Sequence, residues 1–175
     1  MLRAVSLAPD CAPPTCRPLS CSAVAAEREA ALPVAGRCAV QWVLGDATAL
    51  PFGEAEFGAA TCGYGLRNVE DIPAALSELH RVLVPGGRAA VLDFNHSDSE
   101  AVTAVQGFFL ENLVVPLARA NGVAPQYEYL RPSIAAFPSG RRLEAMAKAS
   151  GFETAVHYEL AGGLMGILVA TKKAG

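Results

Sequence analysis

Apolar residues along the chain fall into two patterns that predict two kinds of element. Short, nearly continuous apolar runs between Gly, Pro or polar residues are typical of strands covered on both faces. Apolar positions three and four residues apart are typical of helices with one buried face. The predicted strands cover residues 38–44, 56–64, 88–94, 153–160 and 164–171. The predicted helices cover residues 20–31, 71–84, 101–120 and 139–150.

Helices alternate with strands through most of this pattern, and a hairpin at the sequence Ala-Gly-Gly of residues 161–163 joins the last two strands. Alternation of this kind is typical of a doubly wound α/β sheet, and a terminal hairpin adds an antiparallel edge to it. We expect Pro116 to break the helix over residues 101–120. The sequence contains no internal repeat, so the prediction is one α/β domain.

The helix over residues 71–84 has the clearest boundaries. Asp71 is a good N-cap residue, and Pro73 fits the first turn, where its missing N–H costs nothing. The sequence Val-Pro-Gly-Gly follows the helix, and Gly86 can take the positive φ of a type II turn. The apolar stripe of the helix, which we expect to pack on the sheet, consists of Ile72, Leu76, Leu79 and Leu83.

Composition excludes several classes of protein. The 175 residues suit one domain, and no unbroken apolar run is long enough to span a membrane. The net charge of −3 gives no basic surface for a nucleic acid. Five Cys without a Cys-x-x-Cys pair, and only three His, predict neither a closed disulfide set nor a structural zinc site. We therefore expect a reducing compartment and no metal.

The first residues differ from the rest in composition. Residues 1–18 are rich in Ala, Pro, Ser and Cys, carry two Arg, and contain Asp10 as their single acid. An organelle transit segment has this composition, and a misassigned first exon would look the same. Either interpretation leaves the folded domain at residues 19–175.

In a doubly wound sheet, ligands bind at the carboxyl ends of the parallel strands. Three polar segments of this sequence fall there: Gly-Asp-Ala at 45–47, Gly-Tyr-Gly-Leu-Arg-Asn at 63–68, and Asp-Phe-Asn-His at 93–96. The carboxylate of Asp46 and the backbone N–H of Ala47 together suit the edge of an adenine ring. Asp46 could equally cap the turn before Pro51.

The segment at residues 63–68 combines glycines with an unusual polar pair. Gly63 and Gly65 would let a flat ligand approach the backbone, or would simply form a turn. Arg67 and Asn68 place a guanidinium fork beside an amide, a combination that can orient oxygen atoms of a substrate. The alternative is a surface arginine paired with a neighbouring acid, Glu70 or Asp71.

The third strand end offers weaker candidates. Asp93 suits a base or a ligand-positioning acid, but an Asp at this place often caps a loop. His96 has the ordinary alternative of a solvated loop histidine. Adjacent His96, Ser97 and Asp98 cannot form a catalytic triad, because three neighbours in sequence cannot adopt its relay geometry.

Five stretches together resemble a known family: GDATALPF, GYGLRNVED, LHRVLVPGGRAAVLDF, EYLRPSI and AGGLMGILVATK. They are similar to the ubiquinone/menaquinone-biosynthesis C-methyltransferase family, over residues 19–172. The segment YEYLRPSIAAFPSG and the Gly-Gly-Leu-Met-Gly ending are more similar to its branch from oxygenic phototrophs, the demethylphylloquinone methyltransferases, than to its ubiquinone branch.

The resemblance implies a class I methyltransferase fold, Rossmann-like, with S-adenosylmethionine as the methyl donor. It places the adenine at Asp46 and Ala47, and the methionine part of the cofactor at Gly63 and Tyr64. The branch implies a chloroplast location and a role in phylloquinone or menaquinone biosynthesis.

The resemblance also implies a prenylated naphthoquinol as substrate. Arg67 and Asn68 would face the quinol, with Arg67 stabilising a developing phenolate and Asn68 fixing the ring, while Tyr129 and Ser133 would cover the substrate. An apolar stretch suits contact with the isoprenoid tail or peripheral contact with a membrane, and a buried core helix would explain the same apolar residues equally well. Its residues are Phe108, Phe109, Leu110, Leu113, Val114, Val115 and Leu117.

The sequence departs from the family at its N-terminal side. The family's first strand, its Gly-rich turn and the acid that accepts the ribose hydroxyls have no counterpart before Trp42. In the family's strand order that first strand lies beside the strand ending at Tyr64, so its loss would expose strand edges. Two hypotheses follow: a quinol C-methyltransferase represented by its C-terminal part, or a noncatalytic relative that binds quinone or serves as an assembly subunit.

Overall fold

The computed structural model describes residues 43, 45–96, 100–109, 112, 116 and 130–175. The strands in these residues are β1 (Phe57–Gly63), β2 (Leu83–Phe94), β3 (Thr154–Leu160) and β4 (Met165–Thr171). The helices are η1 (Leu66–Asn68), α2 (Ile72–Val82), α3 (Glu100–Phe109), α6 (Leu130–Ala136), α7 (Gly140–Ala149) and η3 (Ala161–Gly163).

The four described strands form one sheet in the order β1-β2-β4-β3. Strand β1 runs parallel to β2, whereas β4 is antiparallel to β2 and β3 is antiparallel to β4. The predicted α/β sheet with an antiparallel edge is therefore confirmed. Because β1 and β2 are parallel, their carboxyl ends meet at the same edge of the sheet.

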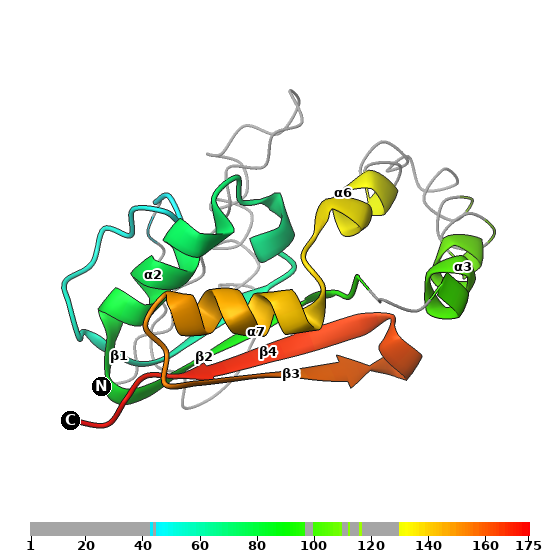
Figure 1. Ribbon diagram of the computed structural model, residues 1–175. Coiled ribbons are helices and arrows are strands. Elements are labelled where there is room, and N and C mark those ends of the chain that lie inside the picture. The colour runs from blue at the N-terminus through cyan, green and yellow to red at the C-terminus, as the bar shows by residue number, and fades with distance from the viewer. Residues whose placement is uncertain (1–42, 44, 97–99, 110–111, 113–115, 117–129) are drawn as a thin grey trace, which may run out of the picture.

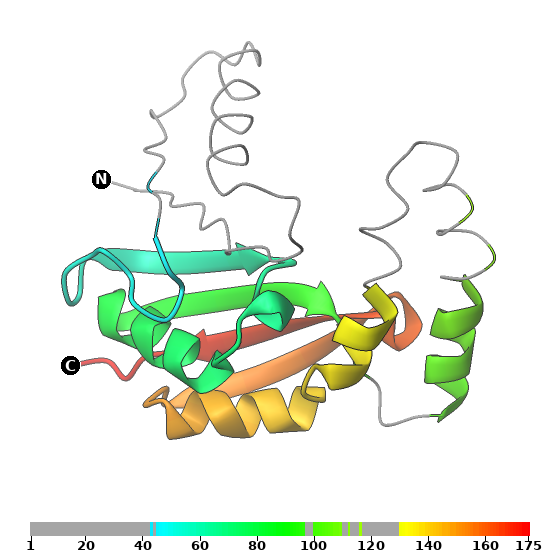
Figure 2. The same cartoon turned by 90° about the horizontal axis from the view of Figure 1, so that it is seen from above.

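Helices α2 and α7 both cover one face of the sheet (Figures 1 and 2). Helix α2 lies between β1 and β2 in the chain, and α7 directly precedes β3. Burial alternates along β4, and the side chains on the covered face, such as Leu168, are buried. Helices α3 and α6 lie beyond the end of the sheet where β1 and β2 finish (Figure 1). They bring additional side chains to the edge at which the predicted site lies.

Helix α2 forms where its sequence predicts, but it ends at Val82, and Leu83 of the predicted stripe is the first residue of β2. The Asp71 carboxylate accepts a hydrogen bond from the backbone N–H of Ala74 at 2.9 Å, and Pro73 lies in the first turn. Leu76 and Leu79 are buried against the sheet. The cap, the proline and the apolar stripe all favour the same helix, so local sequence was sufficient to predict it.

Strand β2 begins at Leu83, five positions earlier than the predicted strand. Phe57 pairs with Leu83 and Ala59 pairs with Arg88, so residues 84–87 bulge out of the ladder opposite a single residue of β1. Gly86 has φ of 77°, the positive angle expected for it in the turn. The predicted turn is thus a bulge inside a longer strand.

The C-terminal elements also match the prediction. Helix α7 and the β3–β4 hairpin lie where the sequence places them, and Gly151 ends α7 with φ of 102°. Helix α3 covers the first half of the predicted helix over residues 101–120, whose remainder lies largely outside the described residues. The predicted helix at 20–31 and all of the predicted strand at 38–44 except Val43 also lie outside them. Helix α6 was not predicted.

Two glycines form a slot for the imidazole of His157. His157 lies in β3, and its ring lies against Gly140 at the start of α7 and Gly166 in β4. A Cβ atom at either glycine would overlap the ring. The ring thereby links the edge of the sheet to the helix above it.

We expect Gly166→Ala to destabilise the fold by about 1–3 kcal/mol, because the added methyl group overpacks the slot. The double variant Gly166→Ala/His157→Ala should recover this loss, since it removes the ring that the methyl group meets. Urea unfolding of the single and double variants measures the coupling. The slot interpretation fails if His157→Ala leaves the cost of the alanine unchanged.

Candidate functional site

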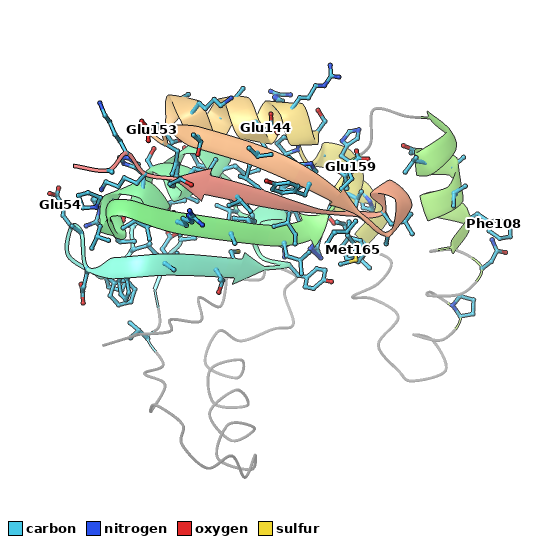
Figure 3. The ribbon with its side chains drawn as sticks, turned by 90° about the horizontal axis from the view of Figure 1, so that it is seen from below. Glu54, Phe108, Glu144, Glu153, Glu159 and Met165 are labelled. Atoms are coloured by element: carbon cyan, nitrogen blue, oxygen red, sulfur yellow. The ribbon has the colours of Figure 1, made fainter. Side chains whose placement is uncertain are left out.

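The site lies where β1 and β2 end side by side. Gly63, the last residue of β1, pairs with Leu92 near the end of β2. The polar segments that follow these two strands therefore meet at one edge, as the sequence predicts. Met165 and Glu159 lie at this end of the sheet, and Glu54 and Glu153 at the opposite end (Figure 3).

Tyr64 leaves β1 in a strained conformation. Its φ is 56°, a left-handed angle that bulky residues rarely adopt. Its ring lies 5.5 Å from the ring of Phe94, its hydroxyl lies 3.9 Å from Sδ of Met165, and 43% of the residue remains exposed. Strain of this kind is concentrated at functional sites. Gly63 beside it has open space: a Cβ there would meet no atom within 4 Å.

Arg67 forms an ion pair with Asp93 across the two strand ends. Nη1 of Arg67 donates to Oδ1 of Asp93 at 3.0 Å, and the backbone N–H of Arg67 donates to Oδ2 at 3.2 Å. The side chains are 9% and 3% exposed, so the pair is nearly buried. Arg67 therefore pairs with Asp93, and not with Glu70 or Asp71 as the surface alternative would have it.

Three further contacts fix the guanidinium of Arg67. Nε donates to Oγ of Ser133 at 3.4 Å, Nη1 also donates to the carbonyl of Tyr64 at 3.2 Å, and the guanidinium carbon lies 5.4 Å from the centre of the Phe94 ring. In the described part of the chain, no acceptor bonds to Nη2. Arg67 is thus anchored at Nε and Nη1 and keeps one terminal nitrogen available.

Asn68 carries an unsatisfied acceptor. Its Oδ1 is buried and has no hydrogen-bond partner among the described residues. A buried amide oxygen without a partner costs about 1–3 kcal/mol, so such an atom is unusual unless a ligand or water completes it. Two neighbouring residues of η1 therefore offer an available donor and an available acceptor.

Asp93 is held in place by the sheet. Its Oδ1 also accepts from the backbone N–H of Phe94 at 2.9 Å. Burial raises the pKa of Asp93 above its ordinary value, and the Arg67 guanidinium opposes this by stabilising the carboxylate. Burial also raises the pKa of the nearby Cys62 thiol, and the negative charge of Asp93 adds to that effect. Behind Asp93, a small cavity is also lined by Phe137, His157 and Gly166.

Asp46 makes its contacts within its own turn. Oδ1 accepts from the backbone N–H and from Oγ1 of Thr48, both at 2.8 Å, and these bonds lower the pKa of Asp46. The turn is closed by pairing of Asp46 with Ala49. The capping alternative thus describes the Asp46 carboxylate in this structure, while the adenine contact of Asp46 and Ala47 stays a prediction.

Of the two residues expected to cover the substrate, the structure places one. Ser133 is buried in α6, contacts Arg67, and donates to the carbonyl of Leu130 at 2.8 Å. Tyr129 lies outside the described residues. His96 is not a free loop histidine, since its Nδ1 lies 2.7 Å from the carbonyl oxygen of Phe137.

Helix α3 presents apolar side chains to solvent. Val105 is 51% exposed and Phe108 is 65% exposed, so Phe108 is not the core residue that the buried-helix alternative expects. In the described ranges, no helix has the length and apolarity needed to cross a membrane. The same residues contain no group of three or more His, Cys, Asp or Glu that could hold a metal ion.

The model of the ubiE/COQ5 methyltransferase family matches residues 22–172 of this chain. This range includes nearly all the described residues and every residue of the predicted site. The chain belongs to the ubiE/COQ5 methyltransferase family. The resemblance of its five sequence stretches to quinone-biosynthesis methyltransferases is therefore confirmed.

Within this family, the chain is similar to enzymes named for one naphthoquinone substrate. It is 53% identical over 76% of its length to the 2-phytyl-1,4-naphtoquinone methyltransferase of Thermosynechococcus vestitus. It is 46% identical over 86% of its length to the chloroplastic 2-phytyl-1,4-beta-naphthoquinone methyltransferase of Arabidopsis thaliana. The chain spans 59% and 58% of the lengths of these two relatives.

Solved structures confirm the fold at low sequence identity. A SAM-dependent methyltransferase of Thermotoga maritima matches 77% of this chain and 65% of its own chain, with a TM-score of 0.54 and 18% identity. The described sheet is thus consistent with a class I methyltransferase fold. The fold explains why family motifs far apart in the chain, GYGLRN and VLDF, meet at one edge.

Loss of the Arg67 charge should leave Asp93 as an unpaired buried carboxylate. We expect Arg67→Met to cost about 3–5 kcal/mol of unfolding free energy at neutral pH. Removal of Arg67 raises the folded-state pKa of Asp93 further, so the cost is full above the folded-state pKa of the variant and fades as pH falls through it toward the folded-state pKa of the wild type.

Urea unfolding at neutral and mildly acidic pH measures this dependence. Arg88→Met removes an exposed arginine from β2 and should change stability by no more than about 0.5 kcal/mol. An equal loss for Arg67→Met at both pH values would show that Asp93 does not carry a buried charge.

Proposed function

We propose that this chain carries out S-adenosylmethionine-dependent C-methylation of a prenylated naphthoquinol, in phylloquinone or menaquinone biosynthesis. The names of its relatives support the reaction and the naphthoquinone ring. The observation that carries the proposal is the arrangement at η1, where Arg67 is anchored with Nη2 available and Asn68 has an unsatisfied buried acceptor. A quinol hydroxyl, which both donates and accepts, complements these two groups.

Arg67 would stabilise the charge that forms during the reaction. An aromatic carbon of the quinol would become a good nucleophile as the neighbouring hydroxyl loses its proton to water, and negative charge would develop on that oxygen. After methylation the ring carbon would lose its hydrogen as a proton to water, and the hydroxyl would regain one. Donors already fixed in place stabilise such charge without reorganising. Asp93, Ser133 and the Tyr64 carbonyl fix the guanidinium of Arg67 before any substrate binds.

Asn68 would set the position of the ring. Its Oδ1 would accept a hydrogen bond from a quinol hydroxyl, which would satisfy the buried oxygen. Holding the ring in one orientation places the reacting carbon in line with the methyl donor, and orientation of this kind contributes strongly to rate. Asn68 then acts by orientation and Arg67 by electrostatics.

S-adenosylmethionine, when bound, supplies the electrophilic methyl group. The open space at Gly63 and the exposed, strained Tyr64 fit a ligand that lies close to the backbone at the end of β1. Asp46 and Ala47 would receive the adenine, since the second carboxylate oxygen of Asp46 is not used by Thr48.

The exposed apolar side chains of α3 suit the isoprenoid tail of such a substrate. Val105 and Phe108 are exposed on α3, which lies beyond the same end of the sheet (Figure 1), and Phe108 points away from the sheet (Figure 3). They would contact the tail or a membrane surface. The chloroplastic relative from Arabidopsis supports a plastid location.

The purified chain, with radiolabelled S-adenosylmethionine and 2-phytyl-1,4-naphthoquinol, should yield labelled phylloquinol. The oxidised quinone should not react, because its ring lacks the electron density for attack, and phylloquinol should not react because its ring position is already methylated. Chromatography of the labelled lipid measures the product. A folded chain that binds the quinol without transferring label would instead support the noncatalytic quinone-binding relative.

Arg67→Lys should lower kcat about 100-fold, because lysine keeps a charge beside Asp93 but lacks the second terminal nitrogen. The affinity for S-adenosylmethionine, measured by calorimetry, should not change. Arg88→Lys, at an exposed position of β2, is the matched control. A loss of tenfold or less would exclude the phenolate-stabilising role of Arg67.

A further inference from the structure

We propose that Asp93 is a positioning residue for Arg67, and that its carboxylate sets where the available Nη2 of Arg67 lies. The inference rests on the proposed function, since it assigns the residue that prepares Arg67 for the quinol. Asp93 is distinct from the substrate-facing residues because its oxygens are already bonded to protein donors.

The carboxylate of Asp93 holds Arg67 at two separate points. Oδ2 accepts from the backbone N–H of Arg67 at 3.2 Å, and Oδ1 accepts from Nη1 of its side chain at 3.0 Å. One rigid group therefore holds Arg67 both at its backbone and at the tip of its long, flexible side chain. Fixing Nη1 and Nε also fixes the plane of the guanidinium, so the direction of the Nη2 donors follows.

Asp93 can hold Arg67 because β2 holds Asp93. Strand β2 lies between β1 and β4, and Asp93 pairs with Gly166 of β4. Asp93 is 3% exposed, and its Oδ1 is also bonded to the N–H of Phe94 at 2.9 Å. A site is most precise when its supporting residue belongs to such a rigid element. Arg67, in contrast, lies in the short helix η1.

The Phe94 ring supports Arg67 from another side. The guanidinium carbon lies 5.4 Å from the ring centre, and the ring also packs against Leu130 and Ile134 of α6. The last two residues of β2 thus contact Arg67 through an ion pair and a ring. Phe94 limits the movement of the guanidinium, and among the described residues only the Asp93 carboxylate pairs with its charge.

The protonation of Asp93 gives a readout that a purely structural residue would not give. In the part of the chain that the structure describes, the titratable groups that face the carboxyl group are Arg67 from η1, Cys62 from β1, and His157 of β3 across the small cavity. Burial raises the pKa of Asp93 above its ordinary value. Acid therefore protonates Asp93 and releases Arg67 at a higher pH than for an exposed aspartate.

The test uses Asp93→Asn, Asp93→Glu and a control, Glu78→Gln. Asparagine is nearly the same shape but carries no charge and turns one acceptor into a donor that faces Arg67. Glutamate restores the charge. Glu78 pairs with Arg81 in α2 at 2.7 Å, so Glu78→Gln removes a carboxylate from another arginine. Circular dichroism and urea unfolding establish that each variant is folded.

The first readout is the side-chain NMR spectrum of ¹⁵N-labelled arginine, in which Arg67→Lys identifies the Arg67 signals. In the wild-type chain, a fixed guanidinium should give separate, slowly exchanging Nη signals. Asp93→Asn should average them, Asp93→Glu should restore them in part, and Glu78→Gln should leave them unchanged. Unchanged Arg67 signals in folded Asp93→Asn overturn the inference.

A second measurement needs no variant, in case Asp93→Asn does not fold. In a pH titration of the wild-type chain, the Arg67 signals should move with the same midpoint as the ¹³C carboxyl signal of Asp93. Midpoints that differ would overturn the positioning role, because Arg67 would not respond to the charge of Asp93.

Turnover separates this inference from the proposed function. In an active chain, Asp93→Asn should lower kcat about 100-fold with the KM for S-adenosylmethionine unchanged, and should abolish the acid limb of the pH profile. If the wild-type chain fixes Arg67 by NMR but transfers no methyl group, the proposed function fails and the positioning role stands. If Asp93→Asn keeps full turnover in an active chain, the positioning role fails and the function stands.

Discussion

The edge of the sheet depends on one constraint: a carboxylate buried at the end of β2 needs a cation, and Arg67 supplies it. Without a partner, the buried charge of Asp93 would destabilise the fold. The ion pair with Arg67 compensates this charge and joins the segment after β1 to the end of β2. Ser133 adds α6 to the same cluster through Nε of Arg67. Fold stability and the geometry of the proposed site therefore depend on the same contact.

Local sequence predicts the elements whose determinants are close together in the chain. Asp71, Pro73 and the apolar stripe specify α2 within a few residues, and Gly151 marks the end of α7. The early start of β2 was missed because its first residue, Leu83, pairs across a bulge with Phe57, a long-range contact that no local pattern reveals. Helix α6 was missed because Pro132, near its start, reads as a helix breaker in an isolated segment.

The candidate site shows the same difference between features set by local sequence and features set by long-range contacts. The sequence and its family resemblance selected Arg67, Asn68 and Ser133. The structure joins Arg67 to Ser133 by a hydrogen bond, and Oδ1 of Asn68 has no partner among the described residues. The sequence named Asp93 only as one candidate among several, because its pairing with Arg67 depends on β1 and β2 being neighbours. Phe94 gave no polar signal at all. A search for opposite charges at the ends of adjacent predicted strands would have paired Asp93 with Arg67.

The central claim is that the anchored guanidinium of Arg67 receives an oxygen of a naphthoquinol. The most direct measurement is a crystal structure of the chain with bound 2-phytyl-1,4-naphthoquinol. The account predicts a ring oxygen within hydrogen-bonding distance of Nη2 of Arg67, with the Asp93 contact intact. A naphthoquinol bound away from Arg67, or one that displaces Asp93 from it, would contradict the account.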